Sequence, residues 1–167
     1  MKLDKKERLS LINQYLILEK LYPEEADNFA EYRQVLTEGY ESHYSDIFDH
    51  LYEGLSECQC SEVLSILNMY RYLNDTSNEL SFDRVQSHAW FKFKGFDGNN
   101  ESHQLSYVNF QLNKLNHFAE LKNDKAYYNS HMPTLNKYRA MLAVWNNLDG
   151  TIDPTEDQLL EILESGG

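Results

Sequence analysis

Apolar residues recur at intervals of three and four along most of this chain, which is the spacing of amphipathic helices. Asp4 and Glu7 form a capping box at the start of the first predicted helix, which runs to about Leu21. Pro23 begins a second helix, and Gly39 follows its last turn as a left-handed C-cap. The N-terminal part of the chain therefore predicts two consecutive helices.

Five further helices are predicted from the same spacing, and their apolar positions lie within 44–55, 63–73, 105–115, 135–145 and 159–163. Their start signals are Cys60 or Ser61, Asn99 or Asn100, Pro133, and the run Asp153, Pro154, Thr155 and Glu156, while residues 74–78 resemble the end of the fourth helix. Phe82, Val85 and Trp90 fit another short helix, but residues 90–94 also fit a short extended segment. The pattern predicts an all-α protein, a single compact domain of about seven helices over residues 1–167.

The first predicted helix is apolar on two sides, which is typical of a helix that is central in its fold or shared with another subunit. We expect its second apolar stripe to be a surface of self-association. The first stripe consists of Leu9, Ile12 and Leu16, and the second of Leu11, Tyr15, Leu18 and Tyr22.

The net charge of the chain limits the kinds of binding partner that we expect. The net charge is −12, and residues 19–62 hold most of the excess of acidic groups. Phosphate backbones and anionic membranes attract the opposite sign, so nucleic-acid and membrane binding are not expected. No window approaches 18 apolar residues and the start lacks a signal-peptide core, so we expect a cytoplasmic protein. The acidic face suits a basic protein partner or divalent cations, although a solvated surface is the usual role of such a segment.

Candidate chemistry is sparse. Asp46 and His50 are four residues apart, as are Asp49 and Glu53, but an acidic surface helix produces this spacing by chance. Cys58 and Cys60 are separated by one residue, which does not match the spacing of a thioredoxin-type redox pair or of a zinc site. Gly95 and Gly98 next to a helix start could hold an anion, although a structural turn is the simpler interpretation. We predict no catalytic residue, no metal and no cofactor.

Six short stretches of the sequence occur in the same order as in a known protein family. They are residues 8–15, 38–40, 69–70, 95–97, 107–110 and 137–145. Together they resemble the YfbU family, small bacterial proteins of uncharacterised function, over nearly the whole chain. The resemblance implies an all-helical, cytoplasmic bacterial protein that self-associates, and it brings no activity, cofactor or catalytic residue. Cys58 and Cys60 do not belong to the family pattern.

Some of these blocks place polar residues inside apolar helices, and Asn13 and Gln14 are the clearest case. Buried amides must be hydrogen-bonded, so such residues form either a structural network between helices or a binding site. If a pocket exists, we expect it where six residues converge, namely Asn13, Gln14, Tyr40, Tyr70, Asp97 and Tyr138. The leading hypothesis is a non-enzymatic homo-oligomer that binds another protein. The alternative is a small-molecule or metal-binding enzyme with a polar pocket between helices.

Overall fold

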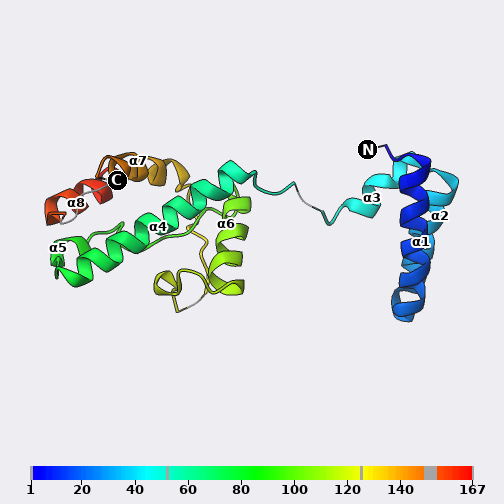
Figure 1. Cartoon of the computed structure of the whole chain (residues 1–167), viewed down its shortest axis with the longest axis horizontal. Coiled ribbons are helices and arrows are strands. Elements are labelled where there is room, and N and C mark those ends of the chain that lie inside the picture. The colour runs from blue at the N-terminus through cyan, green and yellow to red at the C-terminus, as the bar shows by residue number, and fades with distance from the viewer. Residues whose placement is uncertain (1, 52, 125, 149–153, 167) are drawn as a thin grey trace. The chain divides into compact units, whose positions relative to one another are not determined.

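The structure is a computed structural model that describes residues 2–51, 53–124, 126–148 and 154–166. The chain divides into two compact units, Met1–Glu53 and Gly54–Gly167, and each is described here by itself (Figure 1). The described residues form eight α-helices with short 3₁₀ turns and no strand, which confirms the all-α class. The single domain over residues 1–167 stays a prediction.

The first unit is a helical hairpin followed by a short helix. Its elements are α1 (Lys5–Leu21), a 3₁₀ turn (Pro23–Glu25), α2 (Ala26–Glu38), a second 3₁₀ turn (Glu41–His43) and α3 (Tyr44–Phe48) (Figure 1). The Asp4–Glu7 capping box is present, and Gly39 ends α2 with a φ of 75°, as predicted. The buried core of this unit is small and consists of Leu36, Tyr44 and Ile47.

Two arginines hold the hairpin together. Arg33 Nε of α2 lies 2.6 Å from Glu19 Oε1 of α1. Arg8 Nη1 lies 3.4 Å from the hydroxyl oxygen of Tyr44, and a Cβ at Gly39 would approach Arg8 Nη1 to 2.1 Å. The Arg8 guanidinium therefore lies against the C-terminal end of α2, where the helix dipole favours positive charge.

The second unit is built around one long helix, α4 (Glu57–Glu79), which packs against α5, α6 and α7 (Figure 1). α8 packs against α5 and α7. The elements after α4 are α5 (Asp83–Gln86), α6 (Ser102–Asn109) with a π-helical turn (Phe110–Lys114), a 3₁₀ turn (Ala119–Leu121), α7 (Leu135–Asn147) and α8 (Glu156–Glu164).

The predicted limits of two helices were wrong. The prediction extended the third helix through Leu51 to Leu55, but α3 ends at Phe48. Leu51 is exposed, so no burial of its side chain favours a longer helix. α4 begins four residues earlier than Ser61, at a capping box between Ser56 and Gln59. It also continues through the polar run 74–78, since its buried side extends to Ser77.

Three later features also differ from the prediction. Residues 90–94 form no strand, and α5 covers only four residues, while an isolated bridge joins Phe96 to Asn129. α6 begins at Ser102, and neither Asn99 nor Asn100 is its N-cap. α8 is capped by Thr155, whose hydroxyl accepts the backbone N–H of Gln158, while the predicted cap Asp153 lies outside the described residues.

Candidate functional site

The six candidate binding residues are divided between the two units. Asn13 and Gln14 lie on α1 and Tyr40 follows α2, and all three are exposed. Because Asn13 and Gln14 are exposed, they are not buried amides and need no hydrogen-bond partner within the protein. Convergence of all six residues stays a prediction. The other three residues lie in the second unit, where they are buried: Tyr70, Asp97 and Tyr138.

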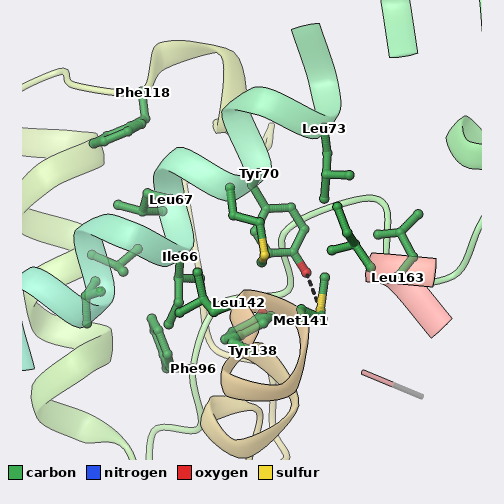
Figure 2. Close-up of a cluster of buried hydrophobic side chains, with 14 of the residues drawn as sticks. Ile66, Leu67, Tyr70, Leu73, Phe96, Phe118, Tyr138, Met141, Leu142 and Leu163 are labelled. Atoms are coloured by element: carbon green, nitrogen blue, oxygen red, sulfur yellow. Dashed lines mark hydrogen bonds between the residues drawn. The ribbon is translucent and has the colours of Figure 1, made fainter. Parts of the chain in front are cut away.

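Tyr70 and Tyr138 meet inside the core of the second unit. Their ring centroids are 5.6 Å apart in an edge-to-face arrangement, and Phe93 lies within 5.6 Å of both rings. The Tyr70 hydroxyl approaches the sulfur of Met141 at 3.9 Å (Figure 2). Edge-to-face aromatic pairs add stability beyond the area that they bury. These tyrosines join α4 to α7.

Burial raises the pKa of the Tyr70 hydroxyl well above 10, and it raises the pKa of Tyr138 as well. Both hydroxyls therefore keep their protons at neutral pH and act as hydrogen-bond donors. Tyr138 donates to the carbonyl oxygen of Gly95 at 3.0 Å and accepts the backbone N–H of Lys94 at 3.2 Å. This arrangement fixes the backbone at Lys94 and Gly95 and leaves the Tyr138 hydroxyl unsuited to act as a base.

Tyr138→Phe is expected to cost roughly 1–3 kcal/mol, because the backbone N–H of Lys94 loses its acceptor and the Gly95 carbonyl keeps only the donor hydroxyl of Thr134. Tyr128→Phe is expected to change stability by less than about 0.5 kcal/mol, since the buried Tyr128 hydroxyl has no hydrogen-bond partner among the described residues. Urea unfolding followed by circular dichroism measures both variants. Equal losses in the two variants would contradict this assignment of the hydroxyl contacts.

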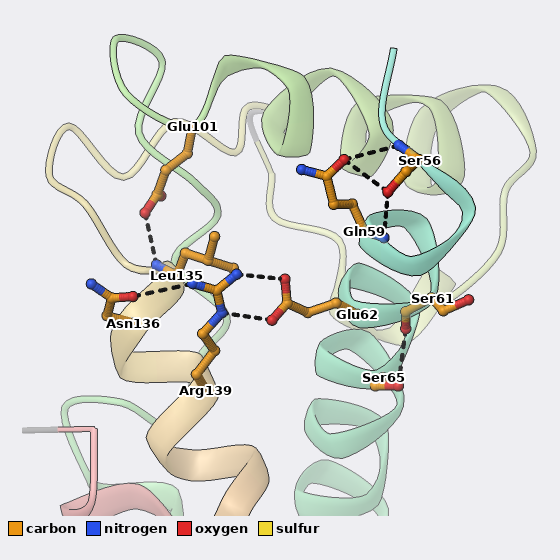
Figure 3. Close-up of polar contacts among 9 residues, drawn as sticks. All are labelled: Ser56, Gln59, Ser61, Glu62, Ser65, Glu101, Leu135, Asn136 and Arg139. Atoms are coloured by element: carbon orange, nitrogen blue, oxygen red, sulfur yellow. Dashed lines mark hydrogen bonds and ion pairs between the residues drawn. The ribbon is translucent and has the colours of Figure 1, made fainter.

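A buried carboxylate, that of Glu101, lies in the second unit together with these tyrosines. It accepts the backbone N–H groups of Asp97 at 2.9 Å and Thr134 at 2.9 Å. It also accepts that of Leu135 at 2.8 Å (Figure 3). Thr134 and Leu135 stand at the N-terminal end of α7, where the helix dipole favours negative charge. Glu101 thus caps α7 from a distant part of the chain, and both of its oxygens are occupied.

Hydrogen bonds within the protein occupy several backbone groups of the turn between Gly95 and Asn100. The backbone N–H of Phe96 bonds to the carbonyl oxygen of Tyr128 at 2.9 Å, and that of Gly98 bonds to Asn129 Oδ1 at 3.1 Å. Asp97 caps the turn by accepting the backbone and side-chain N–H groups of Asn100. Because the N–H groups of Phe96, Gly98 and Asn100 already have partners, the contacts favour a structural turn over an anion site.

Sequence reasoning missed Glu101 and Thr134. Asp97 and Glu101 stand four residues apart ahead of a helix, which resembles a shifted capping box and could have indicated a local network. The partner segment begins 33 residues later, and nothing local in the sequence indicates that pairing. A second interhelical contact joins Arg139 Nε to Glu62 Oε1 at 2.6 Å on a more exposed surface (Figure 3).

The weaker candidates for redox and metal chemistry gain no support. Cys58 and Cys60 lie in the first turns of α4, and side chains two apart on a helix point to different sides. Asp46 and His50 do not share a helix, because α3 ends at Phe48. Within the described ranges, no group of three or more His, Cys, Asp or Glu side chains could hold a metal ion.

The apolar stripe that α1 exposes is not the predicted one. Leu11 and Tyr15 of the predicted stripe pack within the first unit, and the Tyr15 and Tyr32 rings are 5.7 Å apart. Ile12 of the other stripe packs there too, whereas Tyr22 of the predicted stripe is exposed, and α1 contributes no fully buried residue. Four large side chains of α1 stay exposed, namely Leu9 (57%), Leu16 (45%), Ile17 (59%) and Leu21 (64%).

The second unit contains a pocket of about 270 Å³ between α4, residues 91–93 and residues 120–124. Tyr70 and Asn74 line its α4 side. Arg71 holds the loop side of the pocket. Its Nε lies 2.5 Å from Glu120 Oε1, and its Cζ lies 4.1 Å from the ring centroid of Phe118. Burial alone would raise the pKa of Glu120, but the hydrogen bond and charge of Arg71 hold it below its ordinary value.

Comparison with known proteins places the chain in a family. The model of the YfbU domain matches residues 1–165. The chain belongs to the YfbU family. A similar protein, the UPF0304 protein MJECS11 of the archaeon Methanocaldococcus jannaschii, is 33% identical over 169 residues, which cover 98% of this chain and 99% of that protein. Membership confirms the resemblance. The YfbU family is one of uncharacterised proteins and assigns no activity, and the bacterial source and cytoplasmic location stay predictions.

Hydropathy adds one observation for this YfbU member. In the part of the chain that the structure describes, no helix is both long enough and apolar enough to cross a lipid bilayer.

Proposed function

We propose that this YfbU protein is a non-enzymatic protein that forms a homo-oligomer through α1 and acts by binding another protein. The observation that carries the proposal is the exposed apolar stripe of α1, which consists of Leu9, Leu16, Ile17 and Leu21. Positions separated by seven, eight and twelve residues fall on one side of a helix, so these four side chains form one surface.

The size of the first unit supports self-association. Its buried core has three residues, whereas a chain of about 50 residues is only marginally stable without further burial. Covering a leucine or isoleucine side chain contributes roughly 1.5–3 kcal/mol. A second copy offers the same apolar stripe and thereby a matching surface.

The proposal predicts that Ile17→Glu shifts the protein from oligomer to monomer at micromolar concentration, because the new carboxylate would be buried without a partner. Gln34→Glu is the matched control, since it adds the same charge at an exposed position of α2. Light scattering coupled to size exclusion measures both variants. A wild-type protein that is a folded monomer at low micromolar concentration would overturn the proposal, as would an equal effect of the two substitutions.

Binding of a second protein is the other half of the proposal. Residues 19–62 carry twelve acidic groups against Lys20 and Arg33, which suits a basic partner whose affinity falls with salt. The chain, used as bait at low salt, is expected to retain such a partner and release it as the salt concentration rises. Recovery of nothing at low salt would contradict this half and leave self-association untouched.

The buried polar groups support a non-enzymatic role. The Tyr70 and Tyr138 hydroxyls are protonated and engaged, and the Glu101 carboxylate accepts three backbone N–H groups. General acid–base catalysis needs a group that can exchange its proton with a substrate. These groups instead hold α4, α7 and the 95–101 turn together.

A further inference from the structure

We propose that the pocket between α4, residues 91–93 and residues 120–124 binds a small organic carboxylate with an aromatic or branched apolar body. The site lies wholly within the second unit, and the inference is independent of self-association through α1. A volume of about 270 Å³ suits a ligand of metabolite size and is slightly below the range typical of drug-sized ligands.

Four residues form the apolar part of the pocket lining, which we call its base. Phe91, Phe93 and Leu121 are half-buried and line it beside the buried ring of Tyr70. Phe93 is fixed by packing, since its ring centroid is 5.3 Å from that of Tyr70 and 5.9 Å from that of Phe96. A base of fixed aromatic and aliphatic groups favours the flat or branched body of a ligand over a sugar or a free ion.

The rim of the pocket carries the charge. Lys92 and Lys122 are exposed there, and Lys122 Nζ donates to the neutral side chain of Asn116 at 2.6 Å. The charge of Glu120 is balanced by its ion pair with Arg71. Among the lining residues, Asp124 is then the acidic group that opposes the charges of the two lysines. In a chain of net charge −12, this rim is locally positive and selects an anion.

Contacts between lining residues and residues outside the lining fix the loop side of the pocket. Arg71 of α4 bonds to Glu120 and lies over the ring of Phe118, which joins the 3₁₀ turn Ala119–Leu121 to α4. Asn123 exchanges hydrogen bonds with the backbone of Tyr127 at 2.7 and 3.2 Å, which fixes the end of the loop. A pre-formed pocket loses less conformational entropy when a ligand binds.

The test uses 4-fluorobenzoate as the probe and ¹⁹F NMR of the full chain as the readout. We expect saturable binding of 4-fluorobenzoate, much weaker binding of fluoroacetate, which lacks the apolar body, and no saturable binding of 4-fluorobenzylamine, which has the opposite charge. Absence of saturation with 4-fluorobenzoate, or equal binding of the amine, would overturn the proposal.

Substitutions place the binding at the pocket. Lys92→Gln combined with Lys122→Gln is expected to weaken 4-fluorobenzoate binding by roughly fivefold or more, as expected for the loss of two partly exposed charge contacts. The matched control combines Lys5→Gln with Lys114→Gln, which removes the same charge at exposed positions away from the lining. Equal weakening by the two pairs would assign the effect to net charge and would reject the pocket as the site.

Discussion

Gly95→Ala is expected to destabilise the second unit by more than about 4 kcal/mol, which is in the exceptional range for one substitution. A Cβ at Gly95 would lie 1.7 Å from the carbonyl oxygen of Tyr128 and 2.4 Å from its carbonyl carbon. The φ of Gly95 is +85°, a conformation that also strains any residue with a side chain. Relief of the clash would separate residue 95 from residue 128 and break the adjoining bond from Phe96 N–H to the Tyr128 carbonyl.

Gly54→Ala is the matched control for Gly95→Ala. A Cβ at Gly54 would meet no atom within 4 Å, and its φ lies outside the left-handed range. We expect this substitution to stay within about 0.5 kcal/mol of wild type. Thermal and urea unfolding, followed by circular dichroism, measure both variants. A Gly95→Ala protein as stable as the control would contradict the close approach of the two segments.

The second large effect is expected at Glu101. Glu101→Gln replaces a carboxylate oxygen with an NH₂ group that faces backbone donors, and it removes the charge at the start of α7. An unsatisfied buried N–H costs about 1–3 kcal/mol, so we expect a loss of roughly 3–5 kcal/mol from the group of three. The free energy of unfolding from urea titration gives the value.

Glu62→Gln makes the same chemical change at the surface ion pair with Arg139. Because Arg139 is half-exposed there, we expect a loss below about 1 kcal/mol. The contrast between the two substitutions separates a buried helix cap from a surface ion pair. If Glu101→Gln lowered the free energy of unfolding no more than Glu62→Gln, the hydrogen bonds of Glu101 to Thr134 and Leu135 would contribute no more stability than a surface ion pair.

Local signals predicted the first unit well. The capping box at Asp4 and Glu7 and the left-handed glycine at Gly39 depend on residues within one helical turn, and both were confirmed. The exposed stripe of α1 was assigned to the wrong side. Two apolar stripes on one helix look alike in a sequence, and no local pattern indicates that Leu11 and Tyr15 of the predicted stripe pack within the hairpin.

The second unit was harder to predict because its key contacts are distant in the sequence. The helical period identified α4, but the polar composition of residues 74–78 suggested an early end, although the helix continues. Tyr70 and Tyr138 were both chosen as candidates, and their rings do meet. The pairing of Glu101 with Thr134 and Leu135 was not predictable, since those residues lie 33 and 34 positions later in the chain.

The distance along the chain between contacting residues also bears on biosynthesis. Glu62 and Tyr70 of α4 meet their partners Arg139 and Met141 only 77 and 71 residues later. A nascent chain can close the α1–α2 hairpin early and can then pack α5 and α6 against α4, but the part of α4 that contacts α7 stays uncovered until α7 has left the ribosome. During that interval we expect this apolar part of α4 to be open to aggregation and to capture by chaperones.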